Sequence, residues 1–137
     1  MELDSNNHSV FLLWYHLVLV VKYRRKVIDD ARSNRLKEIF EKIAPNYHII
    51  LQEWNHDQDH IHCLFKAHPN SALSKFINTY KTASSRLIKK EYPTIREKLW
   101  KEYFWSWSFC LLTTGGVSIE VIKKYIQNQG QKSYEKN

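Results

Sequence analysis

Apolar and polar positions along this chain follow two periods, one typical of strands and one typical of helices. Four segments fit strands, namely Phe11 to about Tyr23, Tyr47 to Trp54, His60 to about Ala67, and Phe104 to Thr114. The last segment has the alternation of a strand with one buried face, because Trp105, Trp107, Phe109 and Leu111 are separated by Ser106, Ser108 and Cys110. The segment from Ile95 to Tyr103 fits a short helical or irregular stretch.

Apolar residues three and four positions apart predict three helices between and after these strands. Asp29 and Asp30 are suited to cap the first, which we expect to end at Pro45. The second opens at Pro69-Asn70-Ser71 and stops at Tyr92-Pro93. Gly115-Gly116 break the fourth strand, and Ser118 caps the last helix.

The predicted order is strand, helix, strand, strand, helix, strand and a terminal helix. This order predicts an α+β fold of the ferredoxin-like, split βαβ type, in which helices cover one face of an antiparallel sheet. With 137 residues the chain is expected to form a single domain, 1–137, with an ordered core of about 10–130.

Charge narrows the class of partner. The chain has 21 Lys plus Arg against 14 Asp plus Glu, a formal charge of +7, which favours a polyanion such as nucleic acid. Its 5 Trp, 8 Tyr and 6 Phe include rings suited to stacking on unpaired bases, although most are expected in the core. Two cysteines form no disulfide framework. The longest apolar run, Val10 to Val21, contains His16 and predicts neither a membrane span nor a signal peptide, so we expect a cytoplasmic protein.

The candidate chemistry lies in Asp59-His60-Ile61-His62 and in Tyr125 with Gln129. In a strand His60 and His62 share one face, and in a helix Tyr125 and Gln129 share one edge. Two imidazoles and a carboxamide oxygen supply half of an octahedral shell, which suits Mg²⁺ or Mn²⁺ and leaves positions for phosphate and water. Tyr125 is then the nucleophile of a metal-assisted phosphoryl transfer.

Other interpretations of nearby residues remain open. A structural zinc site using His56, His60, His62 and Cys63 is the alternative, but strand alternation turns Cys63 away from the two histidines. Asp59 is either a hydrogen-bond partner of a ligand histidine or an ordinary turn residue. His16 is interpreted as a core histidine rather than as a metal or DNA contact.

Clusters of cations indicate where a phosphate backbone would bind. One cluster, where the first strand ends, comprises Lys22, Arg24, Arg25 and Lys26; the other, on the outer face of the second helix, comprises Lys75, Arg86 and Lys89. A solvated strand end and an ordinary charged helix face are the simpler alternatives.

Four stretches together resemble the single-tyrosine transposases of the insertion-sequence 200/605 group, which carry a histidine-hydrophobic-histidine (HUH) motif. They are Tyr15-His16-Leu17-Val18 followed by Lys22-Tyr23-Arg24-Arg25-Lys26-Val27, then Asp59-His60-Ile61-His62, then Ser84-Ser85-Arg86, and Gly115-Gly116-Val117-Ser118 leading into Tyr125-Ile126-Gln127-Asn128-Gln129. Trp107 departs from the proline expected in many relatives, and Trp54-Asn55-His56 is an unusual approach to the histidine motif.

The resemblance implies a transposase that cuts and rejoins single-stranded DNA at insertion-sequence ends through a 5′-phosphotyrosine, recognising hairpins there. It also implies the ferredoxin-like fold. The alternative is a domesticated protein that binds hairpins without cleaving them. Because the fourth strand carries Trp105 and Trp107 at an expected sheet edge, we expect a homodimer. In the resembling family the tyrosine helix reaches the other subunit, which implies composite sites with His60 and His62 from one chain and Tyr125 and Gln129 from either chain, the partner being favoured.

Overall fold

The computed structural model describes residues 12–113 and 119–130. Its strands are β1 (Leu13–Val20), β2 (Ile49–His56), β3 (His60–Ala67) and β4 (Cys110–Thr113). Its α-helices are α1 (Asp30–Ile43), α2 (Leu73–Glu91) and α3 (Ile119–Asn128). Short 3-10 turns lie at Lys22–Arg24, Ala44–Tyr47, Pro93–Lys98 and Trp100–Glu102. None of the helices in these two ranges is both long enough and apolar enough to cross a membrane.

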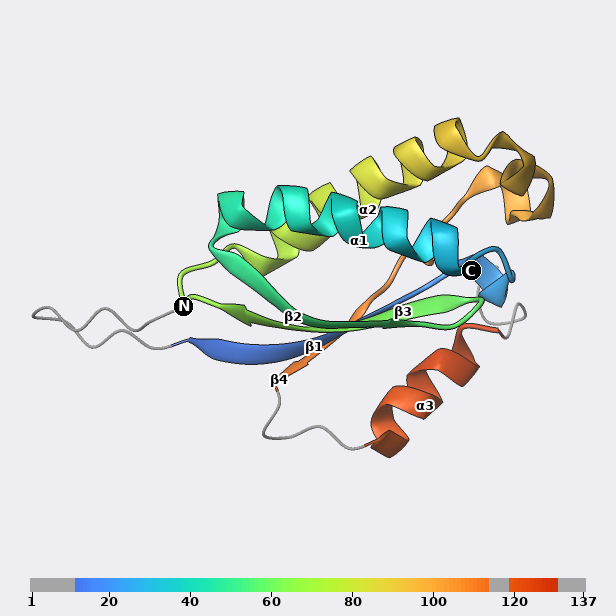
Figure 1. Ribbon diagram of the computed structural model, residues 1–137. Helices are drawn as coiled ribbons and strands as arrows, with labels where there is room; N and C mark the ends of the chain where they lie inside the picture. The colour runs from blue at the N-terminus through green and yellow to red at the C-terminus, as the bar shows by residue number, and fades with distance from the viewer. Residues whose placement is uncertain (1–11, 114–118, 131–137) are drawn as a thin grey trace, which may run out of the picture.

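The four strands form one antiparallel sheet in the order β2-β3-β1-β4. Helices α1 and α2 lie on one face of this sheet, and α3 lies on the other (Figure 1). This arrangement is the predicted ferredoxin-like fold, with β1 and β3 at its centre and β2 and β4 at its edges. The predicted bounds of the third strand are confirmed, whereas the first strand begins at Leu13, within the predicted segment.

Local chemistry explains where α1 begins and why α2 begins later than predicted. The Asp29 side chain accepts a hydrogen bond from the Arg32 backbone N–H at 2.8 Å, which confirms the predicted cap. Helix α2 begins at Leu73, after Pro69-Asn70-Ser71, and has no side-chain cap. Ser71 does not cap the helix because its hydroxyl donates instead to the Tyr47 carbonyl at 2.8 Å. The predicted Gly115-Gly116 break and Ser118 cap lie outside the described residues.

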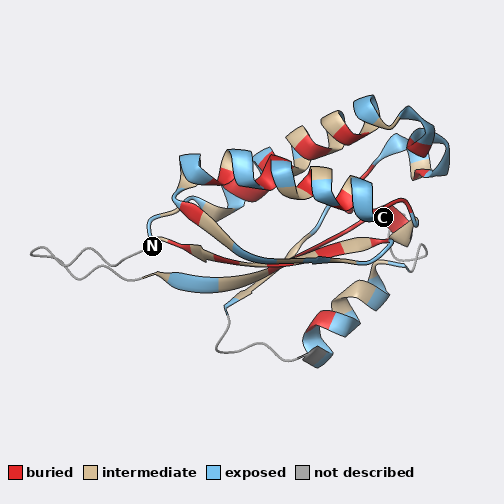
Figure 2. Cartoon of the chain, in the orientation of Figure 1, coloured by how far each residue is buried: buried red, intermediate tan, exposed pale blue. Residues whose placement is uncertain are grey.

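The main core fills the layer between the sheet and helices α1 and α2, where buried residues alternate along β3 (Figure 2). Phe40 of α1 is its centre, with ring centroids of Phe76 and Tyr80 at 5.0 and 5.4 Å. The Tyr80 hydroxyl donates to the Leu36 carbonyl at 2.9 Å, so this buried polar group is satisfied. Burial also raises the pKa of the Cys63 thiol, which makes it an unreactive core residue.

The predicted fourth strand from Phe104 to Thr114 is wrong over its first half. Trp105 makes an isolated bridge to Val21, and regular pairing begins only at Cys110, opposite Val18. If the register of that ladder continued, Val21 would face Trp107 instead of Trp105, so extra residues bulge out between the two pairings. The two tryptophans differ in burial, since Trp105 is 5% exposed and Trp107 is 61% exposed.

Candidate active site

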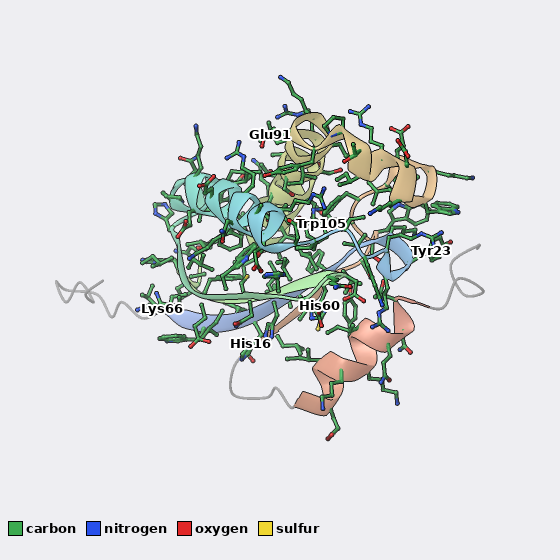
Figure 3. The ribbon with its side chains drawn as sticks, turned by 45° about the vertical axis from the view of Figure 1, so that its right-hand side comes forward. His16, Tyr23, His60, Lys66, Glu91 and Trp105 are labelled. Atoms are coloured by element: carbon green, nitrogen blue, oxygen red, sulfur yellow. The ribbon has the colours of Figure 1, made fainter. Side chains whose placement is uncertain are left out.

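Pairing between β1 and β3 determines which face of the sheet carries the two histidines. His60 lies opposite Val20, and His62 lies opposite Val18. Directly opposed residues of an antiparallel pair point to the same side. Val18 and Val20 pack against Ile122 of α3, so His60 and His62 belong to the α3 face. In Figure 3 the labelled His16 and His60 lie on this side, whereas Trp105 lies toward α2.

Asp59 links the first histidine to an arginine. Its Oδ1 accepts from His60 Nδ1 at 2.8 Å and its Oδ2 accepts from Arg24 Nε at 2.9 Å. Burial of the carboxyl raises its pKa, but these two hydrogen bonds outweigh burial, so the pKa of Asp59 lies below its usual range. An ionised carboxylate on Nδ1 fixes the ring and leaves Nε2 as the nitrogen available to a metal, an arrangement typical of ligand histidines.

His16 is a residue of this site that sequence analysis interpreted differently. Its Nδ1 lies 2.9 Å from His62 Nε2, and the two ring centroids are 5.0 Å apart. The residue is partly exposed and belongs to the α3 face, so it is not a core histidine. Burial lowers the pKa of His62, and its neighbours His16 and His60 lower it further, which favours the neutral imidazole that a metal requires.

The His16 contact was readable in part from the sequence. In any strand His16 and Val18 point to the same face. Because Val18 pairs with His62, His16 lies on the face that carries His62. The strand pairing that brings the rings together was the missing information.

Tyr125 packs on the same face of the sheet as the histidines. Its ring contacts the cluster formed by Val18, Val20 and Ile122, and its hydroxyl lies 2.9 Å from Ser108 Oγ. The valines that support the ring are the residues opposite His62 and His60 in the ladder. The structure therefore places the tyrosine and both histidines, which are far apart in the sequence, on one face of the sheet.

The end of α3 lies beside the Arg24–Asp59 pair. A Cβ placed on Gly130 would be only 2.9 Å from Arg24 Cδ, so the backbone after α3 approaches this arginine closely. Gln129 is in the turn just before Gly130, and its backbone N–H bonds to the Tyr125 and Ile126 carbonyls. The turn that carries Gln129 is thus next to the Asp59 carboxylate that orients His60.

Helix α3 packs on its own sheet in this single chain, and His60, His62, Tyr125 and Gln129 all belong to one molecule. A tyrosine supplied by a partner chain stays a prediction.

The zinc alternative is not supported by this geometry. Cys63 is buried in the main core on the α1–α2 side, and His56 bonds Asp30 Oδ1 at 3.0 Å. Among the residues that the structure describes, no group of three or more His, Cys, Asp or Glu side chains is arranged to hold a metal. Gln is not one of those four residue types, so a set made of two histidines and the Gln129 carboxamide is not covered by that statement. The donors of such a set fit a hard divalent ion.

Two of the predicted DNA contacts have partners within the protein. Lys22 is 2% exposed, and its Nζ lies 3.8 Å from the centroid of the Trp107 ring, so it presents no exposed cation and that interpretation needs correction. Arg24 pairs with Asp59, whereas Arg25 is half-buried and Lys26 is exposed. These cations lie where β1 ends, close to the histidine site.

The cations of α2 line hollows on the opposite side of the sheet. Lys75 and Arg86 are exposed and border a hollow of about 480 Å³ along the helix. A larger hollow of about 660 Å³ lies between α2 and residues 103–107. Arg86 and Lys89 line it together with exposed Tyr103 and Trp107, and the lining residues that the structure describes include no carboxylate. Cations beside exposed rings are suited to nucleic acid.

Comparison with known proteins identifies relatives over most of the chain. The family model "Transposase IS200 like" matches residues 9–129. ISDra2 transposase TnpA of Deinococcus radiodurans is 34% identical over 132 residues, covering 96% of this chain and 94% of that protein. The transposase for insertion sequence element IS200 of Salmonella typhimurium is 26% identical over 122 residues, covering 89% of this chain and 80% of that protein.

Solved structures give the same picture of the fold. A crystal structure of a candidate transposase from Deinococcus radiodurans superposes with a TM-score of 0.79 at 31% identity, covering 92% of this chain and 97% of that one. A tyrosine transposase bound to a REP hairpin superposes with a TM-score of 0.58 at 10% identity, covering 90% and 68%. At that identity the second likeness shows the fold alone.

The Asp59 geometry predicts a difference between two nearby aspartates. Asp59→Ala should lower the free energy of unfolding by about 1–3 kcal/mol, because it removes a buried acceptor of two hydrogen bonds. Asp57→Ala, at an exposed carboxylate in the same loop, should change it by less than about 0.5 kcal/mol. Urea denaturation of both variants at pH 7 measures this, and equal losses would contradict the buried network.

Proposed function

This chain belongs to the IS200-like transposase family, and on that basis we propose that it cuts and rejoins single-stranded DNA at insertion-sequence ends. Tyr125 attacks the scissile phosphate and carries the 5′ end as a phosphotyrosine. Membership makes the chain a transposase, an enzyme that cleaves and rejoins DNA. The observation that carries the finer proposal is that Tyr125 packs on the sheet face of His60 and His62.

The chemistry conserves the energy of the phosphodiester bond. The Tyr125 oxygen bonds to phosphorus as the bond from phosphorus to the 3′ oxygen breaks. The phenol proton leaves to solvent, and the departing 3′ oxygen takes up a proton to become a free hydroxyl. Since one ester replaces another, a DNA 3′-hydroxyl reverses the step at a new junction without ATP.

We propose that His60, His62 and Gln129 hold Mg²⁺ or Mn²⁺ at this site. When bound, the ion would draw charge from the nonbridging phosphate oxygens. Asp59 supports this role because it orients His60, and the lowered pKa of His62 supports it because a ligand imidazole must be neutral.

We propose that cations on both sides of the sheet bind DNA. Arg25 and Lys26 lie near the histidine site and would hold the strand that is cut. Lys75, Arg86 and Lys89 of α2 border hollows suited to the hairpin or its unpaired bases. A tyrosine transposase of the same fold is bound to a REP hairpin, which is consistent with a hairpin as the partner.

We propose a homodimer in which each α3 docks on the partner's sheet. A single chain offers α3 only its own docking surface of Val18, Val20, Cys110 and Leu112. Two chains that exchange α3 keep every contact of that surface, and such exchange is a low-cost route to dimers. The β4 edge, Cys110–Thr113, is open to pairing along the two-fold axis.

Removing the nucleophilic oxygen should separate cleavage from binding. Tyr125→Phe is expected to cleave single-stranded element ends at less than about one thousandth of the wild-type rate, since no other group supplies that oxygen. Hairpin affinity should change by less than about threefold, because the ring that packs on Val18 and Val20 is retained. Product gels and fluorescence anisotropy measure the two quantities. Full cleavage by the variant would contradict the role of Tyr125, and unchanged hairpin binding without any wild-type cleavage would favour the binding-only alternative.

Metal dependence should follow the three proposed ligands. His60→Ala and His62→Ala are each expected to abolish cleavage at limiting Mn²⁺, whereas Gln129→Ala should be milder because water replaces a neutral oxygen ligand. His56→Ala is the matched control, since that imidazole is engaged by Asp30. Titrating Mn²⁺ against the cleavage rate checks this. Wild-type rates for His60→Ala or His62→Ala at limiting metal would remove the proposed site.

Subunit mixing tests the exchange of α3. Tyr125→Phe and His62→Ala proteins are each expected to be inactive, so a mixture allowed to exchange subunits should regain cleavage if Tyr125 acts together with the partner's histidines. Each mixed dimer then holds one site without a lesion. With own-chain docking both sites of a mixed dimer carry a lesion, and an inactive mixture would contradict the shared site.

A further inference from the structure

The Tyr125 hydroxyl meets a serine to which neither the motifs nor the family match assigns a role. Ser108 Oγ lies 2.9 Å from Tyr125 Oη, and Ser108 is exposed to solvent rather than packed in the core. The sequence pattern predicts Ser108 only as a polar residue between Trp107 and Phe109 in a strand. The structure gives it a different position.

Ser108 lies in the irregular segment between the Trp105 bridge and β4. Trp105 pairs with Val21 and Cys110 with Val18, and the extra residues between these pairings bulge out. Within a regular strand the direction of Ser108 would be fixed by alternation. Alternation already directs Ser108 toward α3, as it does Cys110 two residues later, which packs on the cluster of Val18, Val20 and Ile122. The bulge leaves Ser108 exposed beside α3, where it meets the Tyr125 hydroxyl.

Lys81 of α2 holds the bulge from the opposite side of the sheet. Its Nζ donates to the Trp107 carbonyl at 3.0 Å and lies 3.5 Å from the Ser108 carbonyl. Burial, together with the nearby charge of Lys22, lowers the pKa of Lys81 to about 8. These two backbone contacts connect residues 107–108 to α2.

Lys22 fixes the same segment through its side chain. Its ammonium stands 3.8 Å from the Trp107 ring centroid, while the Lys22 backbone N–H bonds to the Phe104 carbonyl at 2.8 Å. The bulge is thus held by a cation on the indole of Trp107 and by a second cation on its carbonyl. Ser108, the next residue, therefore faces α3 from a segment that both lysines contact.

We propose that Ser108 is a positioning residue for the Tyr125 nucleophile and that Lys81 holds Ser108 in place. The proposal rests on the role of Tyr125 given above. In the neutral phenol the Tyr125 hydroxyl donates to Ser108 Oγ. As the phenol proton leaves to solvent, the Ser108 hydroxyl rotates and donates to the phenolate oxygen; Ser108 accepts no proton itself. A hydrogen bond to the charged form favours that form and keeps the oxygen on one line of attack.

The test compares variants of Ser108 by single-turnover cleavage of single-stranded element ends at saturating protein, across pH. Ser108→Ala should be slower by about 10- to 100-fold, the effect of one hydrogen bond to a charged oxygen. The pH at which its cleavage rate is half-maximal should rise, and its hairpin affinity should stay within about twofold of the wild-type value. Ser108→Thr keeps the hydroxyl and should recover most of the rate. Ser74→Ala, at an exposed serine of α2, is the matched control.

A double-mutant cycle tests the part played by Lys81. Lys81→Met should slow cleavage at saturating DNA when Ser108 is present and should have little further effect in the Ser108→Ala protein, because both act through one hydroxyl. Additive losses would overturn the role of Lys81.

Failure of this proposal differs from failure of the proposed function. If Ser108→Ala cleaves with wild-type rate and pH profile while Tyr125→Phe is inactive, the positioning role is overturned and the transposase mechanism stands. Equal slowing by Ser108→Ala and Ser108→Thr, with no pH shift, would also overturn it, because the hydroxyl would not be the group that matters. Full cleavage by Tyr125→Phe would instead overturn the function on which the proposal depends.

Discussion

The antiparallel pairing of β1 with β3 is the constraint on which the rest of this structure depends. A shift of one residue would turn His60 and His62 into the main core and expose Ile61 and Cys63 instead. The register is fixed because alternating residues of β1 and of β3 are buried under α1 and α2. The large core on one face therefore fixes the histidines on the other, and the site needs little packing of its own.

The α3 face is supported from three directions that meet at the site. Asp59 holds His60 from the loop before β3, the approach of Gly130 to Arg24 brings the end of α3 beside that carboxylate, and Ser108 holds the Tyr125 hydroxyl from the bulge before β4. Each support comes from an irregular segment that is itself anchored to the sheet. Regular strands supply the two histidines, while the hydrogen-bond partners of His60 and Tyr125 come from the places where regular structure stops. Lys81 extends this support to α2, whose cations border the hollows proposed for DNA.

Sequence periodicity predicted those parts that local chemistry determines. The alternation in His60–Ala67 gave both the bounds of β3 and the shared face of the histidines, and the Asp29 cap gave the start of α1. The errors arise where distant residues decide. Alternating tryptophans predict a strand whether or not its pairing with β1 is continuous. The bulge becomes visible only through the bridge between Val21 and Trp105. Lys22 was assigned to the surface because the rings that enclose it, including Trp107, are far along the chain. His16 was assigned to the core because an apolar strand gives no sign of an imidazole on the neighbouring one.

The central claim is that the Tyr125 oxygen becomes bonded to DNA. Incubating the protein with a single-stranded element end and Mn²⁺, denaturing it, and digesting both components before mass spectrometry measures this directly. The account predicts that the peptide containing Tyr125 carries a nucleotide through its 5′ phosphate, and that EDTA prevents the adduct. An adduct on another residue, such as Tyr134, or cleavage with a free 5′ phosphate and no adduct, would contradict it.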